Sequence, residues 1–546
     1  MTRTMLIWRS VMVVLVTLLL VSCSSETPAG GGEERAADPA TSAPAAPLRE
    51  QALLEDLVLA NRILTREVGI LDIQAHVSAR SKDTPGHWYM ARFVSPGGAT
   101  LSDMVEYDLE STPVAGPRND NARETYLHGQ IFKHRPDVMA VLHAHTPEFV
   151  AFGMTSAPLY WGPNKRVPVW DIRPVNQGRS GIVGTNALGQ SMSETLGNNE
   201  AVLLWGHGIS LTAKSLPEVV HRAVALRNNA RLQMAAVSIG GSSQPEAIVD
   251  DAAADQRAWD HYKRIDLLAE NGKVPMNPAP MPEKPSDPVG AARHDLVLAN
   301  RILNDPSVGI LTTAGHVSLR HPSNPNSYFV ATAAPGSVTD KDIIERDVTK
   351  PGPDSMGLSI DDEIYKANPN VGAIVVAETP EVVAFTQGVQ LRPVVNGAGF
   401  IGDGLPIFNL STLDPKQPLL SNPALGQGVA AALGTRAGVL LAGRGFVMTG
   451  RTIYNVVGQS YQLRQNARIQ QQAMSLRGKM SYLEDQPFGG GAQGEGGANA
   501  GAGAQGAGGG RGGGGRAGGG GGGGGQQLGP PEGRDWVYWA QTIPVR

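Results

Sequence analysis

This 546-residue chain has one cysteine and no excess of basic residues. A single cysteine excludes a disulfide within the chain and any cysteine-based zinc finger. The 46 Lys and Arg side chains are balanced by 50 Asp and Glu side chains, so the chain lacks the positive field that holds nucleic acid, and we expect no nucleic-acid partner. The apolar run at 11–21 is shorter than the roughly 20 residues that span a bilayer comfortably.

The first residues have the pattern of a secretory signal. Arg3 and Arg9 precede the apolar run. The run ends in Leu20-Val21-Ser22-Cys23, which resembles the lipobox of bacterial lipoproteins. The resemblance implies lipidation of Cys23 and a membrane anchor in the cell envelope, on the periplasmic or extracytoplasmic face, and Ser24 favours the outer membrane. The alternatives are a plain signal peptide with a chance cysteine and an uncleaved anchor.

The body of the chain is an internal duplication. Four segments of the first half recur in the same order in the second half, at offsets between 233 and 240 residues. The matching pairs are 57–64 with 296–303, 76–80 with 316–320, 146–148 with 379–381 and 226–231 with 463–468. Each copy has about 200 residues, which is the size of a domain and not of a solenoid repeat.

Composition sets the remaining boundaries. We predict a lipoprotein signal peptide (1–23), a tether (24–48), a first domain (49–273), a Pro-rich linker (274–288), a second domain (289–487), a Gly-rich insertion (488–529) and an aromatic tail (530–546). The insertion cannot bury apolar surface, so we expect it to be disordered. The tail at 534–539 resembles 257–262 of the first copy. We therefore expect it to complete the second domain and to dock through its aromatic side chains.

Helical and strand patterns alternate along the first copy. Apolar spacing predicts helices at 55–64, 123–134 and 215–237, and short apolar runs predict buried strands at 138–145 and 201–204. This interspersed order is typical of an α/β layered domain.

The first copy also carries a set of side chains suited to a metal. His143 and His145 lie two residues apart on the predicted strand, so both imidazoles leave the same face. His207 lies between two glycines that allow a tight turn, and Glu124 begins a helix. Three histidines with an open position are typical of catalytic zinc. His-x-His alone is more often a pair of packed or surface histidines.

The first copy resembles the class II aldolase/adducin family, which includes fuculose-phosphate aldolase and ribulose-phosphate 4-epimerase. The matching residues run in family order: 76–80, then Glu124 with His128 and 134–138, then 141–147, then 206–208. The resemblance implies two tandem three-layer α/β/α domains with a largely antiparallel central sheet. It also implies a divalent metal, zinc or another cation such as manganese, on His143, His145 and His207, with Glu124 as the catalytic acid/base.

The substrate-binding residues depart from the sugar-phosphate members of the family. Those members have small hydroxyl side chains that cradle phosphate, whereas this chain has His76, Ser78 and Arg80 in the first loop and Arg123 before the glutamate. Such side chains suit a carboxylate, because arginine can bind one with two hydrogen bonds. Ordinary structural pairing is the alternative. The pattern is similar to that of family members that decarboxylate aromatic or muconic-semialdehyde carboxylic acids.

These observations predict a metal-dependent carbon–carbon lyase, either an aldolase or a decarboxylase. Its substrate would be a small hydroxy-carbonyl, carboxylated molecule, and the bond would break through a metal-stabilised enediolate. The alternative is a non-catalytic, adducin-like binding or scaffold lipoprotein. The intact histidines and Glu124 favour the enzyme, since a scaffold has no need of them.

The second copy keeps the frame and loses the ligands. The positions of Glu124, His143, His145 and His207 are taken by Gly357, Val376, Glu378 and Arg444. We expect no catalytic metal there and a structural role for this copy, with Glu378 and Arg444 forming an ion pair in place of the metal.

The family also suggests an assembly. In it, active sites lie between subunits of a four-fold ring and borrow a tyrosine from the neighbour. We therefore expect a homo-oligomer, either a dimer of tandem chains or a tetramer. Tyr160, Tyr262 and Tyr538 are open candidates for the borrowed tyrosine.

Overall fold

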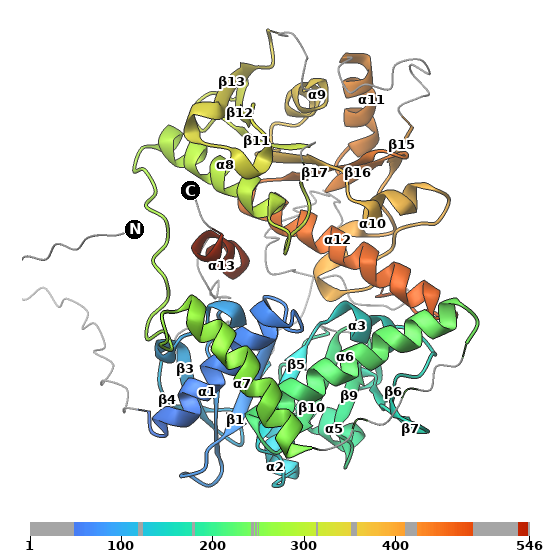
Figure 1. Ribbon diagram of the computed structural model, residues 1–546. Helices are drawn as coiled ribbons and strands as arrows, with labels where there is room; N and C mark the ends of the chain where they lie inside the picture. Colours follow the sequence, from blue (N-terminus) through green and yellow to red (C-terminus); the bar gives the residue numbers. More distant parts are fainter. Residues whose placement is uncertain are drawn as a thin grey trace, which may run out of the picture. The chain divides into compact units, whose positions relative to one another are not determined.

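The structure is a computed structural model that describes residues 48–483 and 533–543 apart from eight short gaps (Figure 1). The gaps are 118–123, 177–180, 242–244, 246–247, 249–250, 313–314, 351–357 and 410–422. Cys23, Arg123 and the Gly-rich insertion of the sequence analysis therefore lie outside the described residues. None of the described helices is long and apolar enough to cross a membrane.

The first copy is built on one eight-stranded sheet with the order β4-β3-β2-β1-β5-β10-β9-β8. All neighbours pair antiparallel except β8 and β9, which pair parallel. The strands, in that order, are Pro113–Ala115, Met104–Asp108, His87–Ala91, His76–Arg80, Ala140–Ala144, Gly208–Ala213, Ala201–Leu204 and Val169–Trp170.

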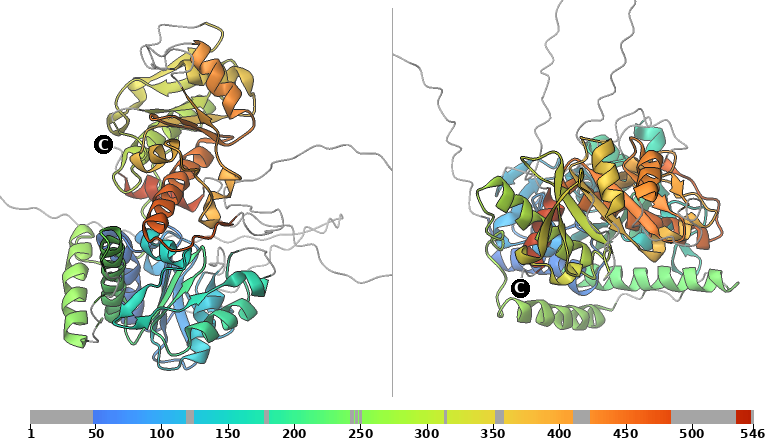
Figure 2. Two further views of the ribbon diagram at one scale, coloured as in Figure 1. Left: turned by 90° about the vertical axis from the view of Figure 1, so that its right-hand side faces the viewer. Right: turned by 90° about the horizontal axis from the view of Figure 1, so that it is seen from above.

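Helices cover both faces of this sheet. Helices α1 (Gln51–Arg62), α3 (Pro147–Gly153) and α6 (Leu216–Ser238) bury their apolar side chains in one core with alternate residues of β5, such as Leu142. Helices α2 (Thr125–His134) and α5 (Asn186–Leu196) form a second core with Val141, on the opposite face. Figure 2 shows the green and the turquoise helices on opposite sides of the sheet. The first copy is thus a three-layer α/β/α domain.

The second copy repeats this plan with a seven-stranded sheet in the order β13-β12-β11-β14-β17-β16-β15. Its strands, in that order, are Ile343–Asp347, Ser327–Ala331, His316–Arg320, Ala373–Ala377, Gly445–Gly450, Gly438–Leu441 and Ile407–Phe408. Helices α8 (Pro288–Asn304) and α12 (Ile453–Ser475) pack on one face, and α9 (Ser359–Ala367) and α11 (Pro423–Leu433) pack on the other. Two mixed, largely antiparallel sheets, one per copy, confirm the predicted fold class.

The longest described helix of each copy begins at a side-chain cap. The Ser215 hydroxyl accepts a hydrogen bond from the backbone N–H of Glu218, and Pro217 occupies the first turn of α6, where its missing N–H costs nothing. Thr452 caps α12 in the same way. Both helices have 23 residues, so the capped start is preserved in the two copies.

The C-terminal helix α13 (Arg534–Thr542) belongs to the core of the second copy. Trp536 and Trp539 are each 3 % exposed and lie among the apolar residues of that core. Their rings meet those of Tyr454 and Tyr461 edge to face, at centroid distances of 4.8 and 5.3 Å. The aromatic side chains of the tail thus hold it against α12.

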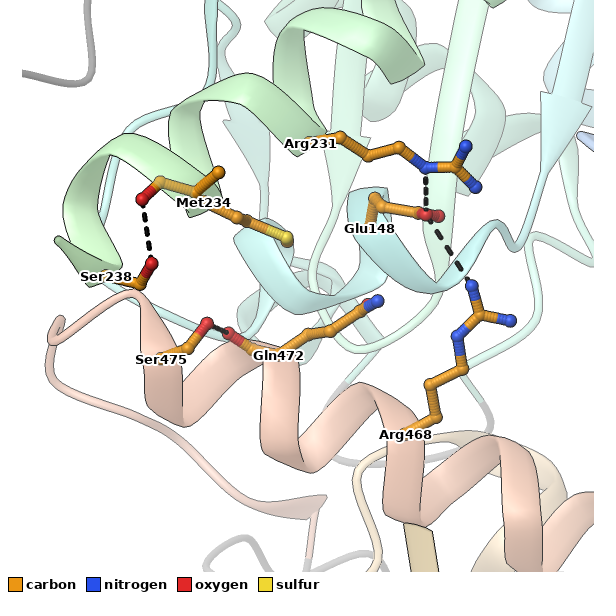
Figure 3. Close-up of a pocket in the computed structure, with 8 residues that line it drawn as sticks. Glu148, Arg231, Met234, Ser238, Arg468, Gln472 and Ser475 are labelled. Atoms are coloured by element: carbon orange, nitrogen blue, oxygen red, sulfur yellow. Dashed lines mark hydrogen bonds and ion pairs between the residues drawn. The ribbon is translucent and has the colours of Figure 1, made fainter. Parts of the chain in front are cut away.

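The described residues of the two copies form one compact unit, and α12 contacts helices of the first copy. Glu148 of α3 is 2 % exposed and accepts a hydrogen bond from Arg231 Nε at 2.7 Å. Arg468 of α12 approaches the same oxygen to 3.7 Å, beside a pocket of about 400 Å³ (Figure 3). The two copies therefore share charged contacts as well as apolar ones.

Candidate metal centre

Strand β5 carries the first of the predicted ligands into the centre of the sheet. His143 lies opposite His76 of β1 on one side and opposite Ser210 of β10 on the other. His145 follows two residues later, just beyond the end of the strand. Because side chains alternate along a strand, both imidazoles leave the face that Val141 shares with α2.

The third histidine stands on a glycine-flanked turn between β9 and β10. Gly206 has φ +61°, a left-handed conformation that favours glycine. Gly208 is needed for space, since a Cβ there would lie 2.2 Å from the carbonyl oxygen of Ala144. The two glycines let the turn bring His207 against the end of β5.

The four predicted side chains converge. One ligand atom each from Glu124, His143, His145 and His207 lie within 4.8 Å of one another. His143 Nε2 lies 3.0 Å from His145 Nε2, and Glu124 Oε2 lies 3.5 Å from His143 Nε2 and 3.4 Å from His207 Nε2. In the described parts of the chain, no other group of His, Cys, Asp or Glu side chains gathers closely enough to hold a metal ion.

Glu124 is fixed at one oxygen and directed at the histidines with the other. It precedes α2, is 9 % exposed, and its Oε1 accepts a hydrogen bond from the backbone N–H of Val183 at 2.9 Å. Burial by itself would raise the pKa of Glu124, but His207 and His143 outweigh that effect and hold the pKa well below its usual range. The side chain is therefore a carboxylate in this setting.

Partners behind the histidines fix their protonation. The Asp72 carboxylate can only accept, so His145 Nδ1 donates to Asp72 Oδ1 at 3.0 Å and leaves its Nε2 lone pair toward the cluster. Ser210 Oγ lies 3.4 Å from His143 Nδ1. Burial lowers the pKa of His143 to about 4, so the ring is neutral at pH 7, the form that binds metals.

This donor set fits a divalent cation. Neutral imidazole nitrogens with a neighbouring carboxylate are the ligands that zinc takes in catalytic sites. His207 Nδ1 is buried, and no residue within the described parts of the chain partners it. The Nε2 lone pair of His145 and the Oε2 atom of Glu124 both face the cluster, where a cation would be bound by such electron-pair donors.

Two further residues complete the site and were missed by the sequence analysis as site residues. Asp72 precedes β1 and supports His145. His128 of α2 is fully buried, with Nε2 2.7 Å from His76 Nδ1 and Nδ1 2.6 Å from Ser78 Oγ. Burial holds the pKa values of His76 and His128 well below their usual range. A hydrogen-bonded chain therefore runs from Ser78 through His128 to His76, whose ring centroid lies 5.3 Å from that of His143.

The structure separates the four predicted substrate-binding residues. His76 is 8 % exposed and borders the histidine cluster. Ser78 is fully buried, and its hydroxyl supports His128, so it reaches the cluster only through other side chains. Arg123 lies outside the described residues.

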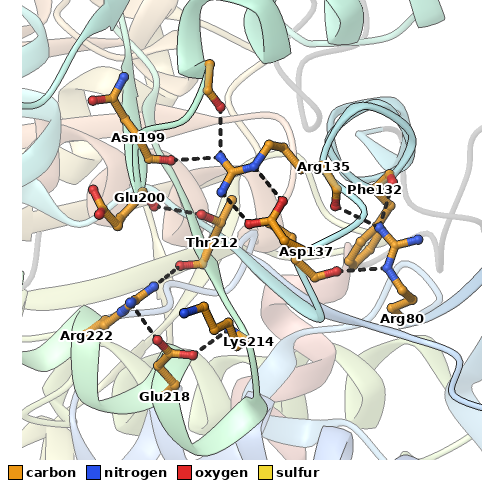
Figure 4. Close-up of polar contacts among 12 residues, drawn as sticks. Arg80, Phe132, Arg135, Asp137, Asn199, Glu200, Thr212, Lys214, Glu218 and Arg222 are labelled. Carbon is orange, nitrogen blue, oxygen red and sulfur yellow. Dashed lines mark hydrogen bonds and ion pairs between the residues drawn. The ribbon is translucent and has the colours of Figure 1, made fainter. Parts of the chain in front are cut away.

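Arg80 stands at the far end of β1, four residues or about 13 Å from His76. Its guanidinium donates to the carbonyls of Phe132, Arg135 and Val138 at 2.6 to 3.0 Å (Figure 4). Arg80 thus ties β1 to the end of α2. This placement gives no support to its predicted role in binding a substrate carboxylate.

The corresponding region of the second copy is differently built. His316, at the position of His76, lies 2.9 Å from Asp361, the residue at the position of His128. The expected ion pair between Glu378 and Arg444 is wrong: both side chains are exposed, and no such pair occurs among the described residues.

Two characterised proteins and one solved structure illustrate what this chain is similar to. Decarboxylase tropJ of Talaromyces stipitatus is 25 % identical over 195 residues, 32 % of this chain and 73 % of that protein. A 3,4-dihydroxyphthalate decarboxylase of Arthrobacter keyseri is 29 % identical over 212 residues, 36 % of this chain and 83 % of that protein. A crystal structure of an aldolase II superfamily protein from Pseudomonas syringae matches with a TM-score of 0.36 and 21 % identity, covering 41 % of this chain and 95 % of that one.

The family model described as Class II Aldolase and Adducin N-terminal domain matches residues 55–234 and 294–471. The first match contains the whole histidine cluster, and the second contains the copy without it. Since the two matches together cover more than half of the sequence, the chain belongs to the class II aldolase and adducin N-terminal domain family, whose domain it contains in two copies.

Proposed function

We propose that this protein is a metal-dependent carbon–carbon lyase, an aldolase or a decarboxylase, that acts through its first copy on a small, carboxylated hydroxy-carbonyl substrate. The observation that carries the proposal is the convergence of Glu124, His143, His145 and His207 within 4.8 Å. The decarboxylases among its relatives support a carboxylated substrate.

His143, His145 and His207 would hold the cation, which we propose to be zinc or another divalent ion such as manganese. A divalent cation supplies Lewis-acid stabilisation of the negative charge that develops on oxygens beside the reacting carbon. The three imidazoles are neutral donors, so they leave the positive charge of the site undiminished. Asp72 and Ser210 hold the His145 and His143 rings in the orientation that this role requires.

Glu124 would move the proton. Its Oε1 is held by the N–H of Val183, so only Oε2 is available for exchange with a substrate. A single oriented oxygen next to the cation site is well placed to take a proton from a substrate hydroxyl or to return one to carbon. We assign Glu124 this acid/base role.

His76 is the residue we propose to contact substrate. Its Nδ1 is engaged by His128, which leaves Nε2 as the polar atom that can meet a substrate oxygen. The same contact fixes the ring, so His76 can position a ligand without first losing side-chain freedom. Arg123, next to Glu124 in the chain, remains our proposal for the substrate carboxylate.

Metal content is the first test. We expect about one zinc or manganese ion per chain by elemental analysis of the purified protein, and its loss in His143→Ala. Val376→Ala is the matched control, because Val376 occupies the same place opposite His316 in the second copy and should leave metal content unchanged. A native protein without metal would contradict the enzyme and favour a scaffold.

Activity is the second test. Hydroxylated aromatic carboxylic acids and aldol adducts of small hydroxy-carbonyl compounds should be screened with and without chelator. Release of CO₂ would identify a decarboxylase, and release of an aldehyde would identify an aldolase. Either activity must disappear with chelator and return with added metal, or the proposed mechanism is wrong.

We further propose that lipidation of Cys23 anchors the protein to the cell envelope and that the chain forms homo-oligomers. Detergent-phase partitioning of the wild type but not of Cys23→Ser would support the anchor. Light scattering in detergent would distinguish a dimer of tandem chains from a tetramer, and a monomer would overturn the assembly.

A further inference from the structure

We propose that the second copy holds the metal site of the first copy in its binding geometry, through the adjacent residues Asp72 and Ile73. The inference rests on the proposed metal site, and it gives the copy without ligands a defined task. It concerns metal affinity, so it can be tested without knowing the substrate.

Asp72 is the link to the metal site. Its Oδ1 accepts from His145 Nδ1 at 3.0 Å and from the backbone N–H of Ala75 at 2.8 Å and of Gln74 at 3.2 Å. One carboxylate oxygen therefore orients a predicted ligand and shapes the turn that leads into β1. Displacement of this turn would move the partner of His145.

Ile73 is the link to the second copy. It is 4 % exposed, and the apolar core in which it lies is otherwise made of residues of the second copy, as far as the structure describes them. The position of the turn that contains Asp72 is thus set by burial of its neighbour in the other domain. In the second copy the residues aligned with Asp72 and Ile73 are Thr312 and Thr313, so carboxylate and anchor are both absent where the metal ligands are absent.

Helix α12 contributes Tyr461 to the apolar core in which Ile73 lies. Tyr461 of α12 is buried, and its ring packs against Trp539 of α13 at 5.3 Å. Burial and then the negative charge of Asp72 raise the pKa of Tyr461, which agrees with a location of this side chain close to Asp72. Ile73, Tyr461 of α12 and Trp539 of α13 therefore share one apolar core.

The turn that carries His207 also lies close to the second copy. A Cβ on Gly206, next to His207, would lie 3.1 Å from Leu483 Cδ2. The N–H of Ser481 donates to the carbonyl of Met154 at 3.0 Å, which holds this segment against the first copy. Each of two histidines thus has a neighbouring residue that lies close to the second copy: Ile73 follows the partner of His145, and Gly206 precedes His207.

The experiment measures zinc affinity by competition with a chromophoric chelator in the full chain. Ile73→Ala should weaken zinc binding about tenfold, the size of effect that follows from disturbing the outer partner of a metal ligand. Ile302→Ala is the matched control, because Ile302 is equally apolar, fully buried in the same core and not adjacent to Asp72. It should lower the melting temperature and leave zinc affinity unchanged.

A double-mutant cycle tests whether Ile73 affects zinc binding through Asp72. If Ile73 acts through Asp72, Ile73→Ala should have less than about a twofold effect in an Asp72→Ala background. Equal weakening in both backgrounds, or equal zinc affinity of Ile73→Ala and Ile302→Ala, would overturn the inference while leaving the metal site intact. Should Ile73→Ala fail to fold, Ile73→Val and Ile302→Val provide the same comparison with a smaller change. A wild type that binds no zinc would overturn the proposed function and this inference together.

Discussion

The closest test of the site geometry uses two glycines that occupy the same place in the two copies. A Cβ on Gly208 would lie 2.2 Å from the carbonyl oxygen of Ala144, and a Cβ on Gly445 would lie 2.2 Å from that of Ala377. Both glycines begin the strand that follows a turn, β10 and β17 respectively. Only Gly208 adjoins a predicted ligand, since His207 precedes it and Arg444 precedes Gly445.

The size of the perturbation follows from the contact. Real Cβ atoms stay at least 3.0 Å from such neighbours, so alanine at either position must move β10 or β17 away by about 0.8 Å. Overpacking of this kind costs about 1–3 kcal/mol. For a domain of this size that lowers the melting temperature by roughly 3–10 °C. A metal site tolerates only about 0.2 Å of change in its ligand distances, so the same shift should weaken zinc binding at least about tenfold in Gly208→Ala.

Thermal unfolding and zinc competition should be measured on both variants. We expect Gly208→Ala and Gly445→Ala to melt at similarly lowered temperatures, and only Gly208→Ala to lose zinc affinity. Unchanged zinc binding by Gly208→Ala, with the same fall in melting temperature, would refute the argument that close packing of β10 on β5 places His207. A loss of zinc affinity in Gly445→Ala would instead show that the effect is general destabilisation.

Three further outcomes are expected. Glu124→Gln should keep the hydrogen bond from Val183 and the bound zinc, but it should lower the turnover of any identified substrate by a factor of about 10²–10⁴. Steady-state kinetics measures the turnover, and metal analysis of the same sample checks the zinc. Arg80→Met and Arg320→Met should each cost about 2–4 kcal/mol in urea unfolding, because Arg80 donates to three backbone carbonyls and Arg320 to four. Neither substitution should change zinc affinity, and a loss of zinc affinity in Arg80→Met alone would return Arg80 to the site. In the metal-free protein, His143 should contribute a loss of up to about 3 kcal/mol as the pH falls from about 6.5 to 4, since unfolded His143 binds a proton that the buried ring, with its pKa of about 4, does not take. Urea unfolding should therefore show a steeper fall for the wild type than for His143→Gln over that range, and equal slopes would contradict this.

The sequence predicts the ligands well because their signals are local. Alternation along a strand places His143 and His145 on one face, and flanking glycines mark the turn that carries His207. Asp72 has no such signal, since it lies 73 residues from His145 in a turn without periodicity. Its signal is comparative: the aligned Thr312 shows that the carboxylate disappears together with the ligands.

Arg80 and the expected pair of Glu378 with Arg444 show why other assignments fail. A guanidinium suits a carboxylate, but Arg80 stands at the opposite end of β1 from His76, and backbone carbonyls occupy it there. Opposite charge suits Glu378 to Arg444, but both side chains are exposed, and exposed side chains gain little from pairing. In both cases the missing information is the surroundings of the side chain, which a sequence pattern does not contain.

Comparison of the two copies also separates the requirements of the fold from those of the site. Val376 fills the place of His143 within the same sheet register, so the fold does not need the histidine. The first copy instead concentrates His76, His128 and His143, all with lowered pKa values, beside a carboxylate, an arrangement that burial alone disfavours. The second copy replaces His128 with Asp361, which bonds His316 and Ser318 directly. The second copy thus pairs its buried polar side chains, whereas the first copy buries several histidines beside a carboxylate, which does not favour stability. The unfavourable arrangement lies where the cation would be bound.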